Sequence, residues 1–194
     1  MRSPLLESTH TLICHQESVR TACQHRSVCT DRLTRWWLAE ECALAVSADR
    51  VWKVACSGDG NDALTKACAG FVDAVDVEGD GGPGSITTLT LSEAAAAASG
   101  GGVMRSRLVA RDGAAPVVSN EVLEGGKVSR QFKSQVVEVK VEPAGDGACV
   151  AKMRVEYERI DGGALAPEEQ AALATGYLSL FKMVEAYLVA NPSE

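Results

Sequence analysis

The 194-residue sequence lacks several features that would place it in other classes of protein. No apolar run approaches the roughly 20 residues that cross a bilayer, and no apolar segment follows a basic start, so we expect neither a membrane span nor a secretory signal. The seven cysteines include no Cys-x-x-Cys pair, and their odd number favours free thiols in a reducing compartment. We therefore expect a cytoplasmic protein, with the nucleus as an additional location.

Histidine and positive charge are also scarce in most of the chain. All three histidines lie within the first 25 residues, so the remainder lacks the side chain best suited to acid–base catalysis near neutral pH. After residue 35, fourteen basic side chains face twenty-three acidic ones. Because such a field repels phosphates, we expect no nucleic-acid partner. The composition favours a binding protein over an enzyme.

Residues 1–35 differ from the rest of the chain, because they show no sustained helical or strand period. We interpret them as an unstructured extension, with a plastid transit peptide as an alternative because the segment is rich in Arg, Ser and Thr. Their metal-ligating residue types are Cys14, His15, Cys23, His25 and Cys29. These spacings match no zinc pattern, so we expect no bound metal.

From residue 36 to residue 194 the pattern predicts one α+β domain. It begins with a strand at Trp36–Leu44 and two short helices, one from Ser47 to Cys56 and one near Asp62–Ala69. Six more strands are predicted at Phe71–Val77, Ser85–Leu91, Val103–Arg111, Pro116–Leu123, Val128–Glu142 and Cys149–Ile160. An Ala- and Gly-rich loop is predicted at Glu93–Gly102. The short connections predict an antiparallel sheet.

Alternation of apolar and charged residues identifies the buried face of this sheet. Val137, Val139 and Val141 alternate with charged residues, as do Met153, Val155 and Tyr157. In the strand Val103–Arg111 the same rule predicts that Met104, Ser106, Leu108 and Ala110 point inward and that Arg105, Arg107 and Arg111 point outward. One face of the sheet is therefore expected to be dry.

The last predicted element is a helix with Pro167, Glu168 and Glu169 in its first turn and Asn191-Pro192 at its end. It should be about 36 Å long. Its apolar stripe contains Leu173, Tyr177, Leu180, Val184 and Tyr187, widened by Gly176, Phe181, Met183 and Leu188. A mid-helix glycine costs about 1 kcal/mol relative to alanine, which suits a helix that walls a space.

The segment Gly79–Gly84 matches the string G-x-G-x-x-G, which in other proteins binds dinucleotides. A strand comes after it here instead of the helix that would receive a phosphate, and Glu78 and Asp80 add negative charge. We therefore interpret it as a tight turn between two strands.

Three segments resemble the Bet v I type family, which comprises the birch-pollen major allergen and the class-ten intracellular pathogenesis-related proteins of plants. Val77–Ile86 resembles the family's glycine-rich loop, Glu124-Gly125-Gly126 the turn after its fifth strand, and Glu185–Pro192 the end of its long helix. The resemblance runs from Trp36 to Pro192. It implies a helix-grip fold of the START-like kind, in which a curved seven-stranded antiparallel sheet holds the C-terminal helix around a cavity open to apolar ligands.

The inward positions include Thr87, Ser106, Asn120 and Gln135, and buried polar groups need partners. They either bond to one another or to water in an ordinary core, or orient a ligand in a hollow one. The candidate ligand-binding residues are Thr87, Leu89, Leu91, Met104, Ser106, Val118, Asn120, Val122, Gln135, Val137, Met153, Val155, Tyr157, Leu173, Gly176, Tyr177, Leu180 and Met183. The glycine-rich loop contributes Gly79, Gly81, Gly82, Pro83 and Gly84.

The resemblance implies a monomeric protein of plant defence or stress responses, without cofactor, that binds a small apolar or amphipathic molecule such as a hormone, flavonoid or sterol-like compound. One alternative is an enzyme of the same fold, similar to norcoclaurine synthase or a ribonuclease. Another is an abscisic-acid-type receptor that inhibits a protein phosphatase, but the Ser-Gly-Leu-Pro-Ala gate and His-Arg-Leu latch of those receptors are absent. A mobile lid at Ala94–Gly102 could still gate a pocket.

Overall fold

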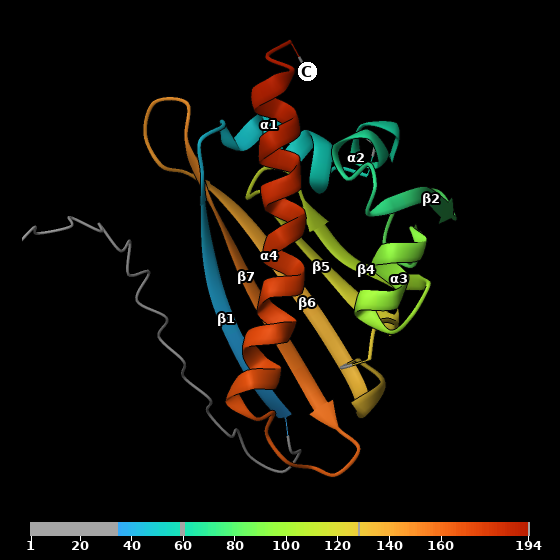
Figure 1. Ribbon diagram of the computed structural model, residues 1–194. Coiled ribbons are helices and arrows are strands. Elements are labelled where there is room, and N and C mark those ends of the chain that lie inside the picture. The colour runs from blue at the N-terminus through green and yellow to red at the C-terminus, as the bar shows by residue number, and fades with distance from the viewer. Residues whose placement is uncertain (1–34, 59–60, 128, 194) are drawn as a thin grey trace, which may run out of the picture.

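A computed structural model describes residues 35–58, 61–127 and 129–193. Seven strands form one antiparallel sheet in the order β1-β7-β6-β5-β4-β3-β2, and the long helix α4 lies across one face of it (Figure 1). The strands are β1 (Arg35–Leu44), β2 (Val72–Glu78), β3 (Ile86–Leu91), β4 (Val103–Asp112), β5 (Val117–Glu124), β6 (Phe132–Pro143) and β7 (Cys149–Arg159). The helices are α1 (Ala48–Ala55), α2 (Asn61–Ala67), α3 (Glu93–Ser99) and α4 (Pro167–Ala190), and a 3₁₀ turn, η1, spans Ser129–Gln131. The predicted fold class is confirmed.

The long strands β6 and β7 form the centre of the packed core. Val137 pairs with Val155, and Val139 pairs with Met153, so four apolar side chains share the inner face. All four are at most 9% exposed. The outward positions carry charges, as two-residue alternation requires.

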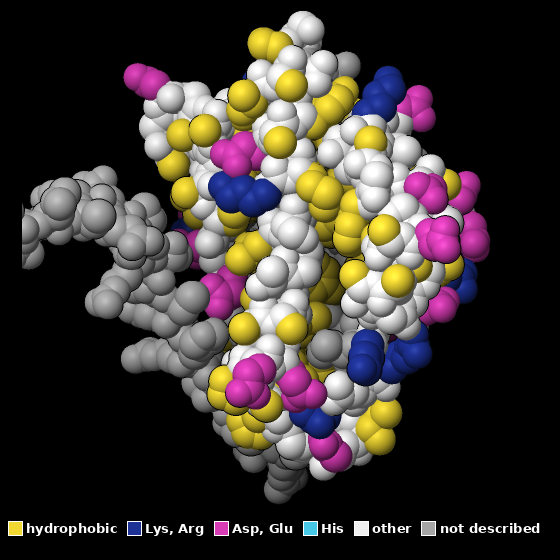
Figure 2. Space-filling view, in the orientation of Figure 1, with side chains coloured by type: hydrophobic (Ala, Val, Ile, Leu, Met, Phe, Trp, Pro, Cys, Tyr) yellow, Lys and Arg dark blue, Asp and Glu magenta, His cyan; other side chains and the backbone are white. Residues whose placement is uncertain are grey.

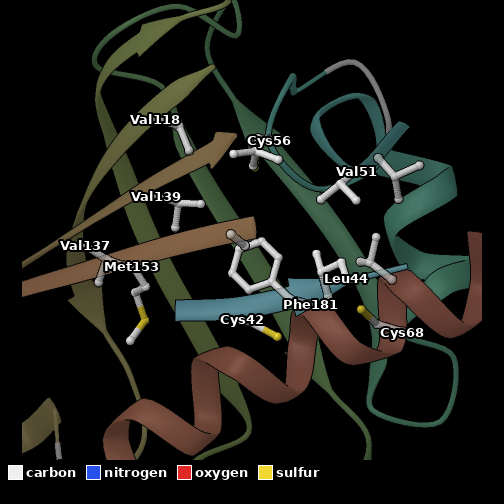
Figure 3. Packing of buried hydrophobic residues seen from close by; sticks show 14 of the residues in the cluster. Cys42, Leu44, Val51, Cys56, Cys68, Val118, Val137, Val139, Met153 and Phe181 are labelled. Atoms are coloured by element: carbon white, nitrogen blue, oxygen red, sulfur yellow. The ribbon is translucent and has the colours of Figure 1, made fainter. Parts of the chain in front are cut away.

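Helix α4 begins and ends where the sequence predicts. Pro167 opens it, the Glu169 carboxylate accepts a hydrogen bond from the Ala166 N–H at 3.1 Å, and Asn191 comes after its last turn. Phe181 points from α4 toward the sheet (Figure 3), and with Leu188 it belongs to the buried side of the helix. This side of the helix completes the core of the domain.

By length and composition, α4 is also apolar enough to cross a membrane, with a mean hydropathy of 1.2 over its most apolar 18-residue window. The expectation that the chain has no membrane span stays a prediction. In the fold Val184 and Leu188 are buried against the rest of the domain. A helix that packs in a protein core meets the same criterion.

The predicted loop Glu93–Gly102 is wrong over most of its length, because its first seven residues form α3. The Ser92 side chain accepts a hydrogen bond from the Ala95 N–H at 3.3 Å and caps the helix, and five consecutive alanines favour helix. Gly100 ends it at φ 75°. The glycines after α3 suggested a loop, but they terminate a helix.

The predicted strand Val128–Glu142 begins late, because β6 starts at Phe132 after the η1 turn. Val128 and residues 1–34 lie outside the described residues. The predictions for an N-terminal extension and for its Cys and His residues therefore fall there, apart from Arg35, which begins β1.

Strand β4 departs from simple alternation at a bulge. Leu108 pairs with Asn120 and Ala110 pairs with Ser119, so Val109 is an extra residue on β4. The bulge reverses the facing of the residues after it. Ala110 is exposed, and Arg111 opposes Val118 on the inner face, so the predicted orientations of both residues are wrong.

Candidate functional site

A pocket of about 220 Å³ lies between α4 and the inner face of the sheet. Strands β3, β4, β5 and β6 form its sheet wall, α1 and α2 contribute at one end, and α4 contributes Tyr177, Leu180, Phe181 and Val184. Figure 2 shows a furrow floored by hydrophobic side chains beside α4, on the side that carries α3. The wall is mainly apolar, with a few polar groups, which is the usual make-up of a small-molecule site.

Three polar side chains lie in this wall at neighbouring positions. Thr87 on β3 pairs with Ser106 on β4, and Asn120 lies on β5. Within the described residues, none of the three side chains forms a hydrogen bond with another protein group. Their donors and acceptors are therefore available to water or to a ligand in the pocket.

A hydrogen-bonded pair links the wall of this pocket to the wall of a second one. The Gln135 Nε2 donates to the Tyr177 hydroxyl at 3.0 Å, and Gln135 is only 2% exposed. Burial raises the pKa of Tyr177, so its phenol stays protonated. The Gln135 Oε1 has no partner within the described part of the chain. Gln135 borders the second pocket, of about 290 Å³, together with Arg130 and Lys133.

Two cysteines behave as apolar wall groups. Burial raises the pKa of Cys56 to about 12 and that of Cys68 to about 11, and both line the pocket. A thiol with so high a pKa is neutral at physiological pH and is a poor nucleophile.

The glycine-rich loop satisfies its own backbone donors. The N–H groups of Gly81, Gly82 and Gly84 donate to Ser85 Oγ (3.0 Å), Asp80 Oδ1 (2.9 Å) and the Leu108 carbonyl (2.7 Å). These bonds leave the three amides unavailable to a phosphate. The loop joins β2 to β3 as the predicted turn, and none of its residues lines the pocket.

Comparison with known proteins assigns the chain to a family. Residues 36–191 match the model of the pathogenesis-related protein Bet v 1 family. The chain belongs to the Bet v 1 family. It is 31% identical over 155 residues to the major allergen Dau c 1 of Daucus carota, covering 78% of this chain and 95% of the allergen. It is 30% identical over 156 residues to pathogenesis-related protein 1 of Asparagus officinalis, covering 80% and 94%.

One further relative of this Bet v 1 family protein carries the name of an enzyme. Ribonuclease 1 of Panax ginseng is 35% identical over 135 residues, covering 69% of this chain and 84% of the ribonuclease. Two solved structures share the fold. Ara h 8.0201 has a TM-score of 0.64 at 22% identity, covering 81% and 99% of the two chains. Norcoclaurine synthase from Thalictrum flavum, in complex with dopamine and hydroxybenzaldehyde, has a TM-score of 0.60 at 20% identity and full coverage of both chains.

The structure brings ten of the predicted ligand-binding residues to the pocket. These are Thr87, Leu89, Met104, Ser106, Val118, Asn120, Val122, Val137, Tyr177 and Leu180. They come from four strands and α4, so the two-residue and 3.6-residue patterns located most of the sheet and helix walls.

The other eight predicted residues do not line this pocket, so their role in ligand binding stays a prediction. These are Leu91, Gln135, Met153, Val155, Tyr157, Leu173, Gly176 and Met183. Met153, Val155 and Tyr157 lie on β7 and are at most 1% exposed, because neighbouring side chains fill the space around them. Gly176 lies on the exposed side of α4, where an added Cβ would meet nothing within 4 Å.

Sequence reasoning missed the end of the pocket formed by α1 and α2. Val54 and Cys56 at one helix, and Leu64 and Cys68 at the other, line that end. The apolar periodicity of a short helix indicates which side is buried, but not whether that side faces a pocket or a filled core. Phe181 and Val184 were in the predicted apolar stripe, so periodicity could have included them. Arg111 was missed because of the bulge in β4.

Proposed function

We propose that this Bet v 1 family protein binds a small hydrophobic or amphipathic plant metabolite in the pocket beside α4. The observation that carries the proposal is the mainly apolar wall with unpaired polar side chains at Thr87, Ser106 and Asn120. Apolar burial would supply most of the affinity, and the polar groups would orient the ligand.

The size of the pocket narrows the ligand class. Its volume of about 220 Å³ lies below the roughly 300 Å³ at which sites for drug-sized ligands begin. A compact hormone-like or short-chain molecule fits this volume better than a sterol. A role in defence or stress responses is supported by the names of the pathogenesis-related relatives.

The test is uptake of N-phenyl-1-naphthylamine, a neutral dye that fluoresces in apolar surroundings. We expect saturable binding to the wild-type protein and competition by small plant metabolites. Thr87→Phe places a large ring in the pocket and should abolish uptake, whereas Thr88→Phe, at the next position of β3, should leave it intact. Absence of saturable uptake, or equal uptake by both variants, would overturn the proposal.

Enzymatic activity is the second candidate, because relatives include a ribonuclease and the fold is shared with norcoclaurine synthase. The titratable groups of the pocket support binding more than catalysis. The pKa values of Tyr177, Cys56 and Cys68 are all raised by burial, away from neutrality. Incubation with RNA, or with an aldehyde and an arylethylamine, tests this candidate, and turnover of either would favour it.

The receptor alternative predicts inhibition of a protein phosphatase in the presence of ligand. Helix α3 occupies Glu93–Ser99, the segment expected to form a mobile lid. The Lys127 N–H donates to the Ser99 carbonyl at 2.8 Å and ties the end of α3 to the turn after β5. This attachment favours a binding protein without a moving gate, and a phosphatase assay with and without ligand distinguishes the two.

A further inference from the structure

Arg111 is a cation that the fold directs into an otherwise mainly apolar pocket. The bulge at Val109 turns it from the outer to the inner face of β4, where it opposes Val118. Both residues line the pocket, and Arg111 is half-buried. Placing a guanidinium beside apolar groups is unfavourable unless its charge and donors are satisfied.

The protein provides hydrogen-bond acceptors for only some of the N–H donors of this guanidinium. Its Nη1 donates to the Gly81 carbonyl at 3.0 Å, which links it to the glycine-rich loop. Its Nε is buried and has no hydrogen-bond partner in the described ranges, nor does Arg111 form an ion pair there. A guanidinium offers five N–H donors in a planar fork, so most of its capacity is unused.

The backbone around Arg111 holds the guanidinium in place. The Arg111 guanidinium lies close to Gly58: a Cβ added to Gly58 would be 2.6 Å from Nη1 and 2.9 Å from the guanidinium carbon of Arg111. Gly58 also has a φ of +83°, which favours glycine. The guanidinium therefore lies between the α1–α2 connection and the glycine-rich loop, with its position set from two sides.

The other charged residues of the pocket wall are Arg105 and Glu124, and neither forms an ion pair with Arg111. Arg105 is paired with Glu78 at 3.6 Å. Glu124 is exposed. In the register between β4 and β5 it lies opposite Arg105, whereas Arg111 lies opposite Val118. Arg111 is thus the cation of this wall that lacks a carboxylate partner among the residues the structure describes.

We propose that Arg111 binds the carboxylate of a small amphipathic organic anion whose apolar part occupies the pocket beside α4. A guanidinium is the side chain best matched to a carboxylate, because its parallel N–H groups bind both oxygens. The inference rests on the proposed binding function and specifies its ligand class as a monocarboxylate.

The experiment measures displacement of N-phenyl-1-naphthylamine by octanoate and by octanol at pH 7.5. The readout is the ratio of the two displacing concentrations within each protein, so a change in dye affinity cancels. In the wild type, octanoate should displace the dye at lower concentration than octanol. In Arg111→Met the preference should fall by about tenfold, as expected for loss of a charge-assisted hydrogen bond.

Arg107→Met is the matched control, because Arg107 lies on the same strand, is exposed and pairs with Glu121 at 2.9 Å. It should keep the wild-type ratio. Arg111→Gln retains an amide that can donate to the Gly81 carbonyl, and it tests the charge if the methionine variant does not fold. It should lose the preference as well.

The outcomes separate the two proposals. Dye uptake with the same octanoate preference in wild type, R111M and R111Q would overturn the role of Arg111 and leave the binding function standing. Dye uptake without any preference in the wild type would do the same. Failure of the wild type to take up dye, octanoate or octanol would overturn both.

Discussion

The inner face of the sheet differs between its two sides, although the sequence alternates in the same way on both. On one side, which we call the packed half, Met153 and Val155 on β7 are at most 1% exposed, and Leu38 and Leu44 on β1 are at most 4% exposed. On the other side, which we call the pocket half, Leu89 on β3 and Met104 on β4 are only half-buried and line the pocket. Strand β6 lies between the two halves.

The position of α4 accounts for this difference. Helix α4 packs beside β1, where the Lys182 Nζ donates to the Ala43 carbonyl at 2.7 Å, whereas β4 and β5 lie on its other side (Figure 1). Where the helix is close, its side chains and those of the sheet fill the interior. Where it is not, the same pattern of inward residues leaves an open volume. Alternation therefore identifies an inner face, and the placement of α4 decides whether that face is filled.

Truncating one methionine in each half is expected to give the largest contrast. Met153→Ala should lower the free energy of unfolding by about 2–5 kcal/mol, because it leaves a cavity in a filled region. Met104→Ala should cost about 1 kcal/mol, since its side chain already borders open volume. Urea unfolding of both variants measures the difference. Equal losses would contradict the division into a packed and a pocket half.

Substitutions in the glycine-rich loop test whether the backbone next to the pocket half is tightly constrained. Gly79→Ala should cost about 1–3 kcal/mol, because φ is +115° there and the new Cβ would be 2.6 Å from Ser85 Oγ. Gly81→Ala is the control, with φ +81° and nothing within 4 Å, and should cost about 1 kcal/mol. Thermal unfolding compares them, and a larger loss for Gly81→Ala would rule out the close contact at Gly79.

The boundary between the halves can be probed at Tyr177. Tyr177→Phe removes the hydroxyl that accepts from Gln135, and it should cost about 1–2 kcal/mol because the whole amide then lies buried without a partner. Tyr187→Phe is a matched control on the same helix, with a half-buried ring, and should change stability by under about 0.5 kcal/mol. If the two variants unfolded alike in urea, the pair would have no role in stability.

Substitution on the outer face of the sheet, at Glu142, should change the free energy of unfolding least. Lys140 and Lys152 lie 2.7 and 2.6 Å from the Glu142 carboxylate and hold its pKa at about 2, below its ordinary value of 4.5. A lowered carboxyl pKa stabilises the fold above pH 4.5, and this contribution disappears as the pH falls through about 2.

Glu142→Gln should therefore unfold more readily than the wild type at pH 6, and the two should converge on acidification toward pH ~2. The difference will be small because the pair is solvent-exposed. Glu138→Gln, at an outward position of the same strand, is the control. Urea midpoints that differ equally at pH 6 and at the acid end would exclude the ion pairs as the cause.

Much of the fold could be predicted from the sequence. Strong two-residue alternation, as at Val137 and Val139, located the inner face, and Pro167 and Asn191 marked the ends of α4. Helix α3 was missed because the glycines after its alanine run are equally typical of a loop. The facing of Arg111 was missed because a bulge adds one residue without changing composition.

The amino-acid sequence by itself determined the order of the elements, the dry face of the sheet and the apolar side of the last helix, because these depend on periods of two and 3.6 residues along the chain. Only the tertiary structure decided which inward residues fill the core and which line a pocket, where α1 and α2 contribute to the pocket wall, and that Arg111 enters it. Those outcomes depend on the distance between elements far apart in sequence and on the register between strands, which local patterns do not encode.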